Sequence, residues 1–249
     1  MYYINYKMHI ENKVYKNNVI ILKSNSSNSI DLEFIENLEQ SIDNTNLDYP
    51  IIIKGNSEFF CSGLNLKFSH YLLQNELKEF IQNFERLLLK ILNLNTITCA
   101  VIEGHCIGGG LIMALACDKI CLYPNNKKIG LNKKYLNITL PPLPEIIIKN
   151  KLSLKNINEI SDIKLLNLKN FKLDEIPHNY YINQNNINNE LMNTKNTSEF
   201  LRLKKQLFKV IYMQYLKNKD EILNNFINSW FKPKSKLKRE QLLKSFNQT

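Results

Sequence analysis

Glycine is scarce in this sequence, with seven residues in 249, none before Gly55 and none after Gly130. Cysteine pairs are absent: the five cysteines contain no C-x-x-C spacing and lie mostly in apolar runs. An odd number of cysteines placed in this way argues against a disulfide framework, and we expect buried free thiols in a reducing compartment. No spacing of His, Cys and Asp residues is typical of a metal site, and we predict none.

Long apolar runs are absent as well. No uninterrupted run reaches the ~18 residues that a membrane-spanning helix needs, so we predict no membrane span. The first residues, MYYINYKMHIENK, do not have the pattern of a signal peptide, and the last, SFNQT, do not match a peroxisomal Ser-Lys-Leu ending. We therefore expect a soluble, cytoplasmic protein, with a mitochondrial or other organelle location left open.

Acidic residues are in the minority, with 23 Asp and Glu against 33 Lys and Arg and a net charge of +10. This excess favours anionic partners, such as nucleic acid, an acidic membrane face or a phosphorylated small molecule. The sequence is also rich in Asn, Lys and Ile, so a solvated lysine surface explains the same excess. Both interpretations stay open, and clusters of Asn or Lys are not counted as functional signals.

The length suits one large domain, or a domain with a helical appendage. Strand and helix patterns alternate through residue 123. Apolar strands are expected at 19–23, 49–55, 96–104 and 119–123. Helices are expected from a cap at Asp31 or Ser29 to about residue 44, over 71–92, and from the glycine run to Cys117. The alternation predicts an α/β fold with buried parallel strands.

The second half of the chain has a different pattern. Residues 128–150 contain three prolines and are predicted to form a loop. The pattern over 152–194 is weak and rich in Asn. Residues 199–246 are predicted to be helical, with breaks near Asn218 and at Lys232-Pro233.

Four of the seven glycines lie in one stretch, GHCIGGGLIMALACD, residues 104–118. A strand, a glycine-rich turn and a helix follow one another there, and a helix beginning at Gly108 to Gly110 presents free N–H groups that suit a phosphate or an oxyanion. Neither G-x-x-x-x-G-K-[ST] nor G-x-G-x-x-G is present. The glycines could equally serve only tight packing of the helix against the strand, and both interpretations stay open from this run alone.

A second glycine follows another predicted strand. The strand YPIIIKG (49–55) leads into NSEFFCSGLNL (56–66), which carries Gly63. Loops at the ends of neighbouring parallel strands can place two N–H groups around one oxygen atom, which is the geometry of an oxyanion hole. The second site therefore favours the functional interpretation of the glycine run.

Three segments carry a resemblance to a known family. FCSGLNL, IEGHCIGGGLIMALACD and IGLNKKYLNITLPP resemble, in order, motifs of the enoyl-CoA hydratase/isomerase (crotonase) family. The resemblance covers residues 14–176, including a weaker match at LKNFKLDEI (168–176), and the isomerase-like members are the most similar. It implies an α/β fold, a crotonase-like spiral of ββα units over residues 1–194, and a helical C-terminal region over 195–249 used for trimer assembly.

The resemblance also implies a site. The backbone N–H groups of Leu64 and Gly109 would form an oxyanion hole for the thioester oxygen of an acyl-CoA. The implied substrate-binding residues are Cys61, Ser62, Gly63, Leu64, Leu66, Gly108 and Gly109. The implied partners are an acyl-CoA and further copies of the chain in a homotrimer or hexamer, and no cofactor is implied beyond the coenzyme A of the substrate.

The sequence departs from the family at its usual acid–base positions. The two glutamates of the family fall at Ile112 and Lys133, and Lys133 is the first substitute base to consider, ahead of His105, Tyr135 and Cys106. Asn137 stands where the family has a glycine, and Asn65 where it has an aspartate of structural role. An isomerase-type proton shift fits this pattern better than hydration, and a catalytically inactive pseudoenzyme or scaffold is the alternative.

The densest basic run is KPKSKLKR, which contains Lys232, Lys234, Lys236, Lys238 and Arg239. A solvated face, a contact with the phosphates of coenzyme A and an RNA-binding tail all explain it. Only Trp230 and Phe231 are adjacent aromatic residues, so a platform for base stacking is absent and nucleic acid is not the expected partner. The scattered His9, His70 and His178 are expected in surface or packing roles.

Overall fold

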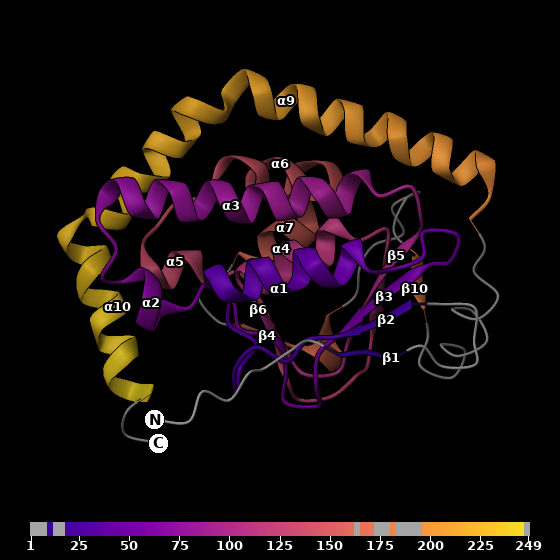
Figure 1. Ribbon diagram of the computed structural model, residues 1–249. Coiled ribbons are helices and arrows are strands. Elements are labelled where there is room, and N and C mark those ends of the chain that lie inside the picture. Colours follow the sequence, from indigo (N-terminus) through magenta and orange to yellow (C-terminus); the bar gives the residue numbers. More distant parts are fainter. Residues whose placement is uncertain (1–8, 12–17, 162–164, 172–179, 183–195, 247–249) are drawn as a thin grey trace.

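The computed structural model describes residues 9–11, 18–161, 165–171, 180–182 and 196–246, and its strands form two sheets (Figure 1). In the six-stranded sheet the order is β1-β2-β3-β5-β7-β10. These strands are His9–Glu11, Asn18–Ile21, Ile51–Lys54, Thr98–Ile102, Lys119–Leu122 and Tyr180–Ile182, in the same order. β1 is antiparallel to β2, whereas all the other neighbours in this sheet are parallel.

The smaller sheet has the order β4-β6-β8-β9. Its strands are Phe59–Cys61, His105–Ile107, Lys128–Gly130 and Leu166–Asn167. β4, β6 and β8 are parallel, and β9 is antiparallel to β8. Consecutive strands (β3 and β4, β5 and β6, β7 and β8) thus enter different sheets, and a helix follows each pair, which confirms the predicted spiral of ββα units.

The helices of the first half cover the sheets. They are α1 (Leu32–Asp43), α2 (Leu66–Ser69), α3 (Gln74–Asn93) and α4 (Gly109–Ala116). α1 begins at Asp31, whose carboxylate accepts a hydrogen bond from the Phe34 N–H at 3.0 Å, so Asp31 rather than Ser29 is the cap. α4 is buried except at its first residue, which places the start of this helix at the boundary of the core.

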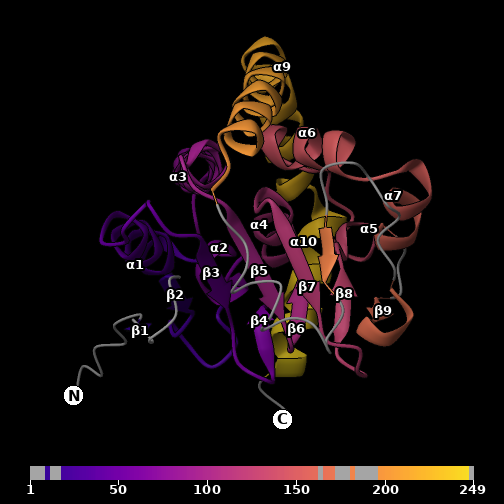
Figure 2. The ribbon, with the colours of Figure 1, turned by 90° about the vertical axis from the view of Figure 1, so that its right-hand side faces the viewer.

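The second half adds further helices: α5 (Lys133–Leu136), α6 (Pro142–Lys151), α7 (Leu154–Ile160), the short 3₁₀ helix η1 (Leu168–Asn170), α9 (Ser198–Phe231) and α10 (Pro233–Phe246). Figure 2 shows α9 lying over α6, next to α3. A buried ion pair fixes the beginning of α9, since the Lys204 Nζ lies 2.6 Å from the Asp118 carboxylate and 2.8 Å from the Thr96 carbonyl oxygen. The use of these C-terminal helices in trimer assembly stays a prediction.

Two expectations for the second half were wrong. Residues 128–150 do not form a loop, since they contain β8, α5 and α6. Their prolines lie in the first turn of α6 or just before it, where a missing N–H removes no intrahelical hydrogen bond. The helix also continues through Asn218, because Asn lowers helix propensity only slightly, and it ends at Lys232-Pro233 as predicted.

Asparagine occupies the left-handed backbone positions. Among the described residues other than glycine, only Asn28, Asn132 and Asn137 have a positive φ, with values of 50°, 45° and 57°. Asn tolerates this conformation better than most residues because its short side chain can hydrogen-bond locally. Asn137 takes this left-handed conformation at the position where the resemblance implies a glycine of the family, so the backbone turn is retained without the glycine.

The cysteine prediction is confirmed, because all five cysteines are free and buried. Within the described ranges, no helix combines the length and the apolar character needed to cross a membrane. Part of the weak match at 168–176, from residue 172 onward, and His178 lie outside the described residues.

Candidate active site

The two glycine loops meet at the ends of β4 and β6. The Ile30 N–H donates to the Gly63 carbonyl at 2.8 Å, and the Asn65 N–H donates to the Ile30 carbonyl at 2.7 Å. In this parallel bridge the Leu64 N–H points away from Ile30. Gly109 is the first residue of α4, so its N–H has no partner within the helix. Within the described part of the chain, neither of these two N–H groups donates a hydrogen bond to another residue.

Gly63 allows the close approach of the loops. Its φ is 92°, and a Cβ atom there would lie 2.8 Å from the Ile107 oxygen and 3.1 Å from the Gly109 nitrogen. Only glycine combines this φ with this contact. Gly110 has a different role, because a Cβ atom there would overlap the backbone of Cys61. Glycine therefore allows the two loops to approach at Gly63 and allows close packing against Cys61 at Gly110.

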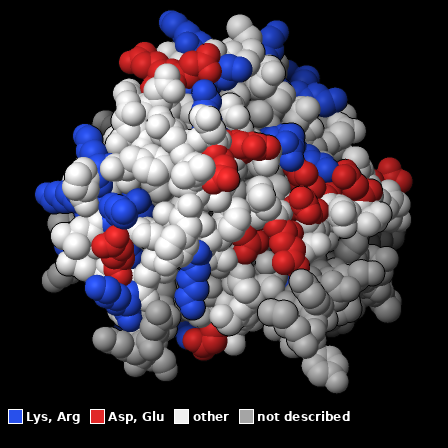
Figure 3. Space-filling view, turned by 60° about the vertical axis from the view of Figure 1, so that its left-hand side comes forward, with Lys and Arg blue, Asp and Glu red and all other residues white. Residues whose placement is uncertain are grey.

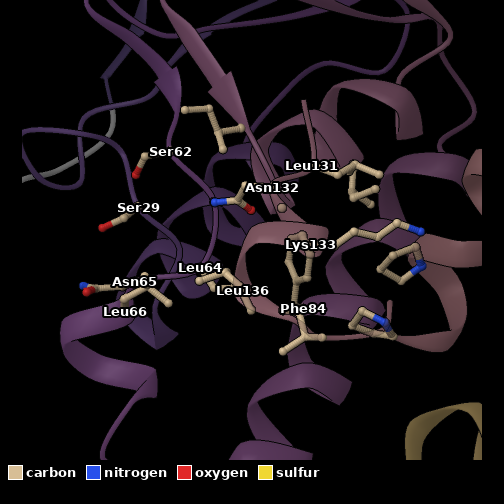
Figure 4. Close-up of a pocket in the computed structure, with 18 of the residues that line it drawn as sticks. Ser29, Ser62, Leu64, Asn65, Leu66, Phe84, Leu131, Asn132, Lys133 and Leu136 are labelled. Carbon is tan, nitrogen blue, oxygen red and sulfur yellow. The ribbon is translucent and has the colours of Figure 1, made fainter. Parts of the chain in front are cut away.

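A cavity of about 760 Å³ opens beside these N–H groups. Of the residues implied by the resemblance, the cavity is lined by Ser62, Gly63, Leu64, Leu66, Gly108, Gly109, Ile112 and Lys133. Cys61 is not part of this lining; it is fully buried, and its Sγ accepts the Gly63 N–H at 3.4 Å. Figure 4 shows Ser29, Ser62 and Asn65 on one side of the cavity and Lys133 on the other, with Leu64 between them.

The described lining of this cavity contains no carboxylate, and Lys67 and Lys133 are its only ionisable residues. Lys133 is the first residue of α5, follows the left-handed Asn132 and is half-buried. Burial lowers the pKa of its ammonium group, and the neighbouring Lys134 and Lys149 act in the same direction, while Glu145 opposes them. In Figure 4 its side chain extends away from Leu64.

The other substitute bases lie outside the cavity lining. The Nδ1 atom of His105 accepts the Lys128 N–H at 2.9 Å, and its ring packs 5.1 Å from that of Phe59, so His105 has a packing role. Cys106 is fully buried, and burial raises the pKa of its thiol. The Tyr135 ring lies 5.2 Å from the Lys238 Nζ. Lys133 therefore remains the candidate base of this set.

Asn65 has the structural role expected of its position. Its Oδ1 accepts the Phe68 N–H at 3.3 Å and thereby caps α2, while its Nδ2 donates to the Asp31 carboxylate at 2.9 Å. These contacts join the beginnings of α1 and α2 beside Gly63 and Leu64. No group of three or more His, Cys, Asp or Glu residues able to hold a metal ion is found in the part of the chain that the structure describes.

The C-terminal helices contribute to the cavity, which sequence reasoning missed. Phe226, Trp230 and Leu242 line it. Arg239 is 1% exposed, its guanidinium lies 4.1 Å from the centre of the Trp230 ring, and it donates to the Trp230 carbonyl at 2.8 Å. The basic run is therefore not a uniformly solvated face. The sequence signal for a buried contact here is the single tryptophan of the chain, which lies two residues before this run.

Charge of both signs is spread over the surface near these helices. On the face shown in Figure 3, basic and acidic side chains are interspersed, and a broad area carries neither. His70, on the same side of the molecule, packs its ring edge-on against Tyr71 at 5.0 Å and lies 3.9 Å from the Glu240 carboxylate. These contacts agree with the packing role expected of His70.

The chain belongs to the family described as enoyl-CoA hydratase/isomerase, which matches residues 15–162, more than half of the chain. The sequence is 35% identical over 88 residues to the enoyl-CoA isomerase/hydratase fer4 of Mycosarcoma maydis, covering 35% of this chain and 32% of that protein. It is 32% identical over 122 residues to the human mitochondrial methylglutaconyl-CoA hydratase, covering 47% of this chain and 36% of that protein. The matched segments span about a third of the length of these relatives.

Solved structures share the fold. Human mitochondrial delta3-delta2-enoyl-CoA isomerase superposes with a TM-score of 0.80 at 17% identity, over 97% of this chain and 98% of that one. The ECH2 decarboxylase domain of CurF from Lyngbya majuscula gives a TM-score of 0.74 at 18% identity, over 96% of this chain and 100% of that one. At these identities the likeness establishes the crotonase fold alone.

Proposed function

We propose that this protein binds an acyl-CoA thioester, with the carbonyl oxygen between the N–H groups of Leu64 and Gly109. The observation that carries the proposal is that Leu64 and Gly109, whose N–H groups donate to no other described residue, both line one largely apolar cavity. Gly63 lies between them without a side chain. The start of α4 adds the positive end of a helix dipole at the same point.

This arrangement stabilises negative charge on the thioester oxygen. Each donor of an oxyanion hole contributes ~2.7–4 kcal/mol to the transition state in enzymes that use one. Hydration or double-bond migration also needs a group that transfers a proton, and such a group contributes ~10²–10⁴ in rate. Because Ile112 stands at one carboxylate position of the family and Lys133 at the other, we infer acyl-CoA binding without efficient hydration.

An isomerase-type proton shift with Lys133 as the base is the second candidate. It is supported by the position of Lys133 in the cavity lining and by the lowered pKa that burial gives its amine. A neutral amine beside the substrate could accept a proton from the carbon next to the thioester while the two N–H groups stabilise the enolate. Binding without turnover distinguishes the first candidate from this one.

The test uses the purified protein with a saturated acyl-CoA, measured by calorimetry, and with 2-enoyl-CoA and 3-enoyl-CoA, measured by product analysis. Gly109→Pro removes the proposed donor, and Gly109→Ala is the matched control because it adds a Cβ atom and keeps the N–H. That Cβ would meet the flexible end of Ile30 at 2.9 Å. We expect the alanine variant to bind and the proline variant to bind weakly. A folded wild-type protein that binds no thioester would overturn the proposal.

A further inference from the structure

A second cavity of about 760 Å³ adjoins the first. It is formed by residues of α5, α6, α7 and the end of α9, among them Leu154, Ile157 and Ser229. Lys133, Ile138, Thr139 and Leu140 line both cavities and form the wall between them. An extended molecule in the first cavity would have to pass these four residues to reach the second.

Positive charge dominates the second cavity. Its lining contains Lys133, Lys134, Lys149 and Lys232, and Glu145 is the single carboxylate among the described lining residues. Glu145 already lies 2.5 Å from the Lys149 Nζ. No described acidic residue forms an ion pair with the other three lysines. Like charges gathered in this way raise the free energy of the empty site, and a bound anion would lower it.

We propose that the second cavity receives a carboxylate at the far end of the acyl group, so that the substrate class is a dicarboxylyl-CoA thioester. The inference rests on the proposed function, which places the thioester oxygen at Leu64 and Gly109. Ser29 and Ser62 lie on the opposite side of the first cavity from Lys133, and Ser62 is expected on the path of coenzyme A (Figure 4). On this placement of coenzyme A, the lysines of the second cavity lie on the side of the acyl group.

The apolar and charged parts of this path suit such an acyl group. Ile138 and Leu140 form the shared wall and would contact its methylene groups. Lys134 and Lys232 are exposed at the second cavity, where they would form ion pairs with the terminal carboxylate. An acyl group that ends in a methyl group would leave both lysines without an ion pair to the ligand, so the two classes of ligand should differ in affinity.

The experiment compares pairs of thioesters with equal numbers of acyl carbon atoms by calorimetry: butanoyl-CoA with succinyl-CoA, pentanoyl-CoA with glutaryl-CoA, hexanoyl-CoA with adipyl-CoA and octanoyl-CoA with suberyl-CoA. The wild-type protein should bind the dicarboxylyl member of at least one pair about tenfold more tightly. The double variant Lys134→Gln/Lys232→Gln should lose this preference and keep its affinity for the monocarboxylyl member. Lys205→Gln/Lys209→Gln removes two exposed charges of α9 outside both cavities and should keep the preference.

The possible results distinguish a failure of this inference from a failure of the proposed function on which it rests. Equal affinity within every pair would overturn the inference and leave the proposed function intact. A preference for dicarboxylyl thioesters that survives in the Lys134→Gln/Lys232→Gln variant would also overturn it, because Lys134 and Lys232 are the residues assigned to the terminal carboxylate. A folded wild-type protein that binds neither member of any pair would overturn the proposed function, and the inference with it.

Discussion

The Cβ atom that Gly63 lacks would lie 3.1 Å from the backbone nitrogen of Gly109. A methyl group at this point would crowd the N–H that we assign to the thioester oxygen. We therefore expect Gly63→Ala to weaken the binding of a saturated acyl-CoA by about tenfold or more, which is the loss of one hydrogen bond of ordinary strength. Calorimetric titration of the variant and the wild-type protein measures the change.

The same substitution also strains the backbone, since Gly63 has a φ of 92°. Alanine in such a conformation costs about 1–2 kcal/mol, so the unfolding free energy must be measured beside the affinity. A variant that remains folded and binds acyl-CoA as tightly as the wild-type protein would contradict the assigned oxyanion site.

Lys133 offers a gain-of-function prediction. It lies in the cavity lining at the position where the resemblance implies a glutamate, and the described lining contains no carboxylate. Lys133→Glu should therefore increase the conversion of 3-enoyl-CoA to 2-enoyl-CoA, by about 10²-fold if the new carboxylate reaches the substrate. Product analysis at high protein concentration measures the rate.

The matched control is Lys205→Glu, which makes the same change of charge at an exposed residue outside both cavities. We expect it to leave the rate near that of the wild-type protein. Equal rates in the wild-type protein and in both variants would show that position 133 does not reach the reacting carbon atoms.

The sequence predicted the part of the site that depends on backbone. Gly63 and Gly109 follow strands, and neighbouring parallel strands bring their carboxyl ends to one edge of a sheet. The sequence brought the two loops together, but it attached them to strands of the larger sheet, whereas Gly63 follows β4 and Gly109 follows β6. It could not separate β5 from β6, because three-residue strands such as His105–Ile107 are too short to show a period.

The contribution of the C-terminal helices could not be predicted in this way. Trp230 and Leu242 reach the cavity because α10 turns back toward α2 and α5, and this path depends on contacts between residues distant in sequence. One such contact joins Ser235 to the Asn137 carbonyl at 2.7 Å. Helical periodicity shows which face of a helix is apolar and not which part of the fold that face will meet.

The scarcity of glycine was also only partly explained by the sequence. The abundance of Asn is not counted as a signal in the sequence, yet Asn28, Asn132 and Asn137 take the left-handed conformation that glycine usually provides. Asn137 shows the difference most clearly, because the resemblance marked it as a lost glycine. The lesson is physical: a left-handed position needs a residue that tolerates positive φ, and Asn meets that need.

We expect the unfolding free energy of the protein to depend on pH through the buried carboxyl group of Glu85. It lies on α3, is 1% exposed, and accepts hydrogen bonds from the Leu143 N–H at 2.8 Å and the Tyr215 hydroxyl at 3.0 Å. Burial raises its pKa from the ordinary 4.5 to about 7. Between these values the folded chain holds a proton that the unfolded chain has lost, so stability falls as pH rises from about 4.5 to 7.

The size of this effect is about 3 kcal/mol if the full shift is realised. Glu85→Gln removes the titration, and its unfolding free energy should fall less over this pH window than that of the wild-type protein. Urea titrations at several pH values measure it, with Glu79→Gln, an exposed site on the same helix, as the control. Parallel pH profiles for the wild-type protein and the Glu85→Gln variant would contradict the prediction.

Arg239 is a buried, structural member of the basic run, unlike the exposed lysines of the same run. Its buried guanidinium lies 4.1 Å from the centre of the Trp230 ring and donates to the Trp230 carbonyl at 2.8 Å. A desolvated cation–π contact is worth about 2 kcal/mol, and the substitution would also leave the carbonyl oxygen without its donor. Arg239→Ala should therefore lower the unfolding free energy by about 2–4 kcal/mol, measured by urea titration.

Lys234→Ala is the control for Arg239→Ala, because Lys234 is an exposed member of the same run. We expect it to change the unfolding free energy by no more than about 0.5 kcal/mol. Since Trp230 lines the first cavity, the loss of Arg239 should also weaken acyl-CoA binding, whereas the loss of Lys234 should not. Equal effects of the two substitutions on stability would mean that the run acts as one solvated surface, and that the Trp230 ring is held in place by other contacts.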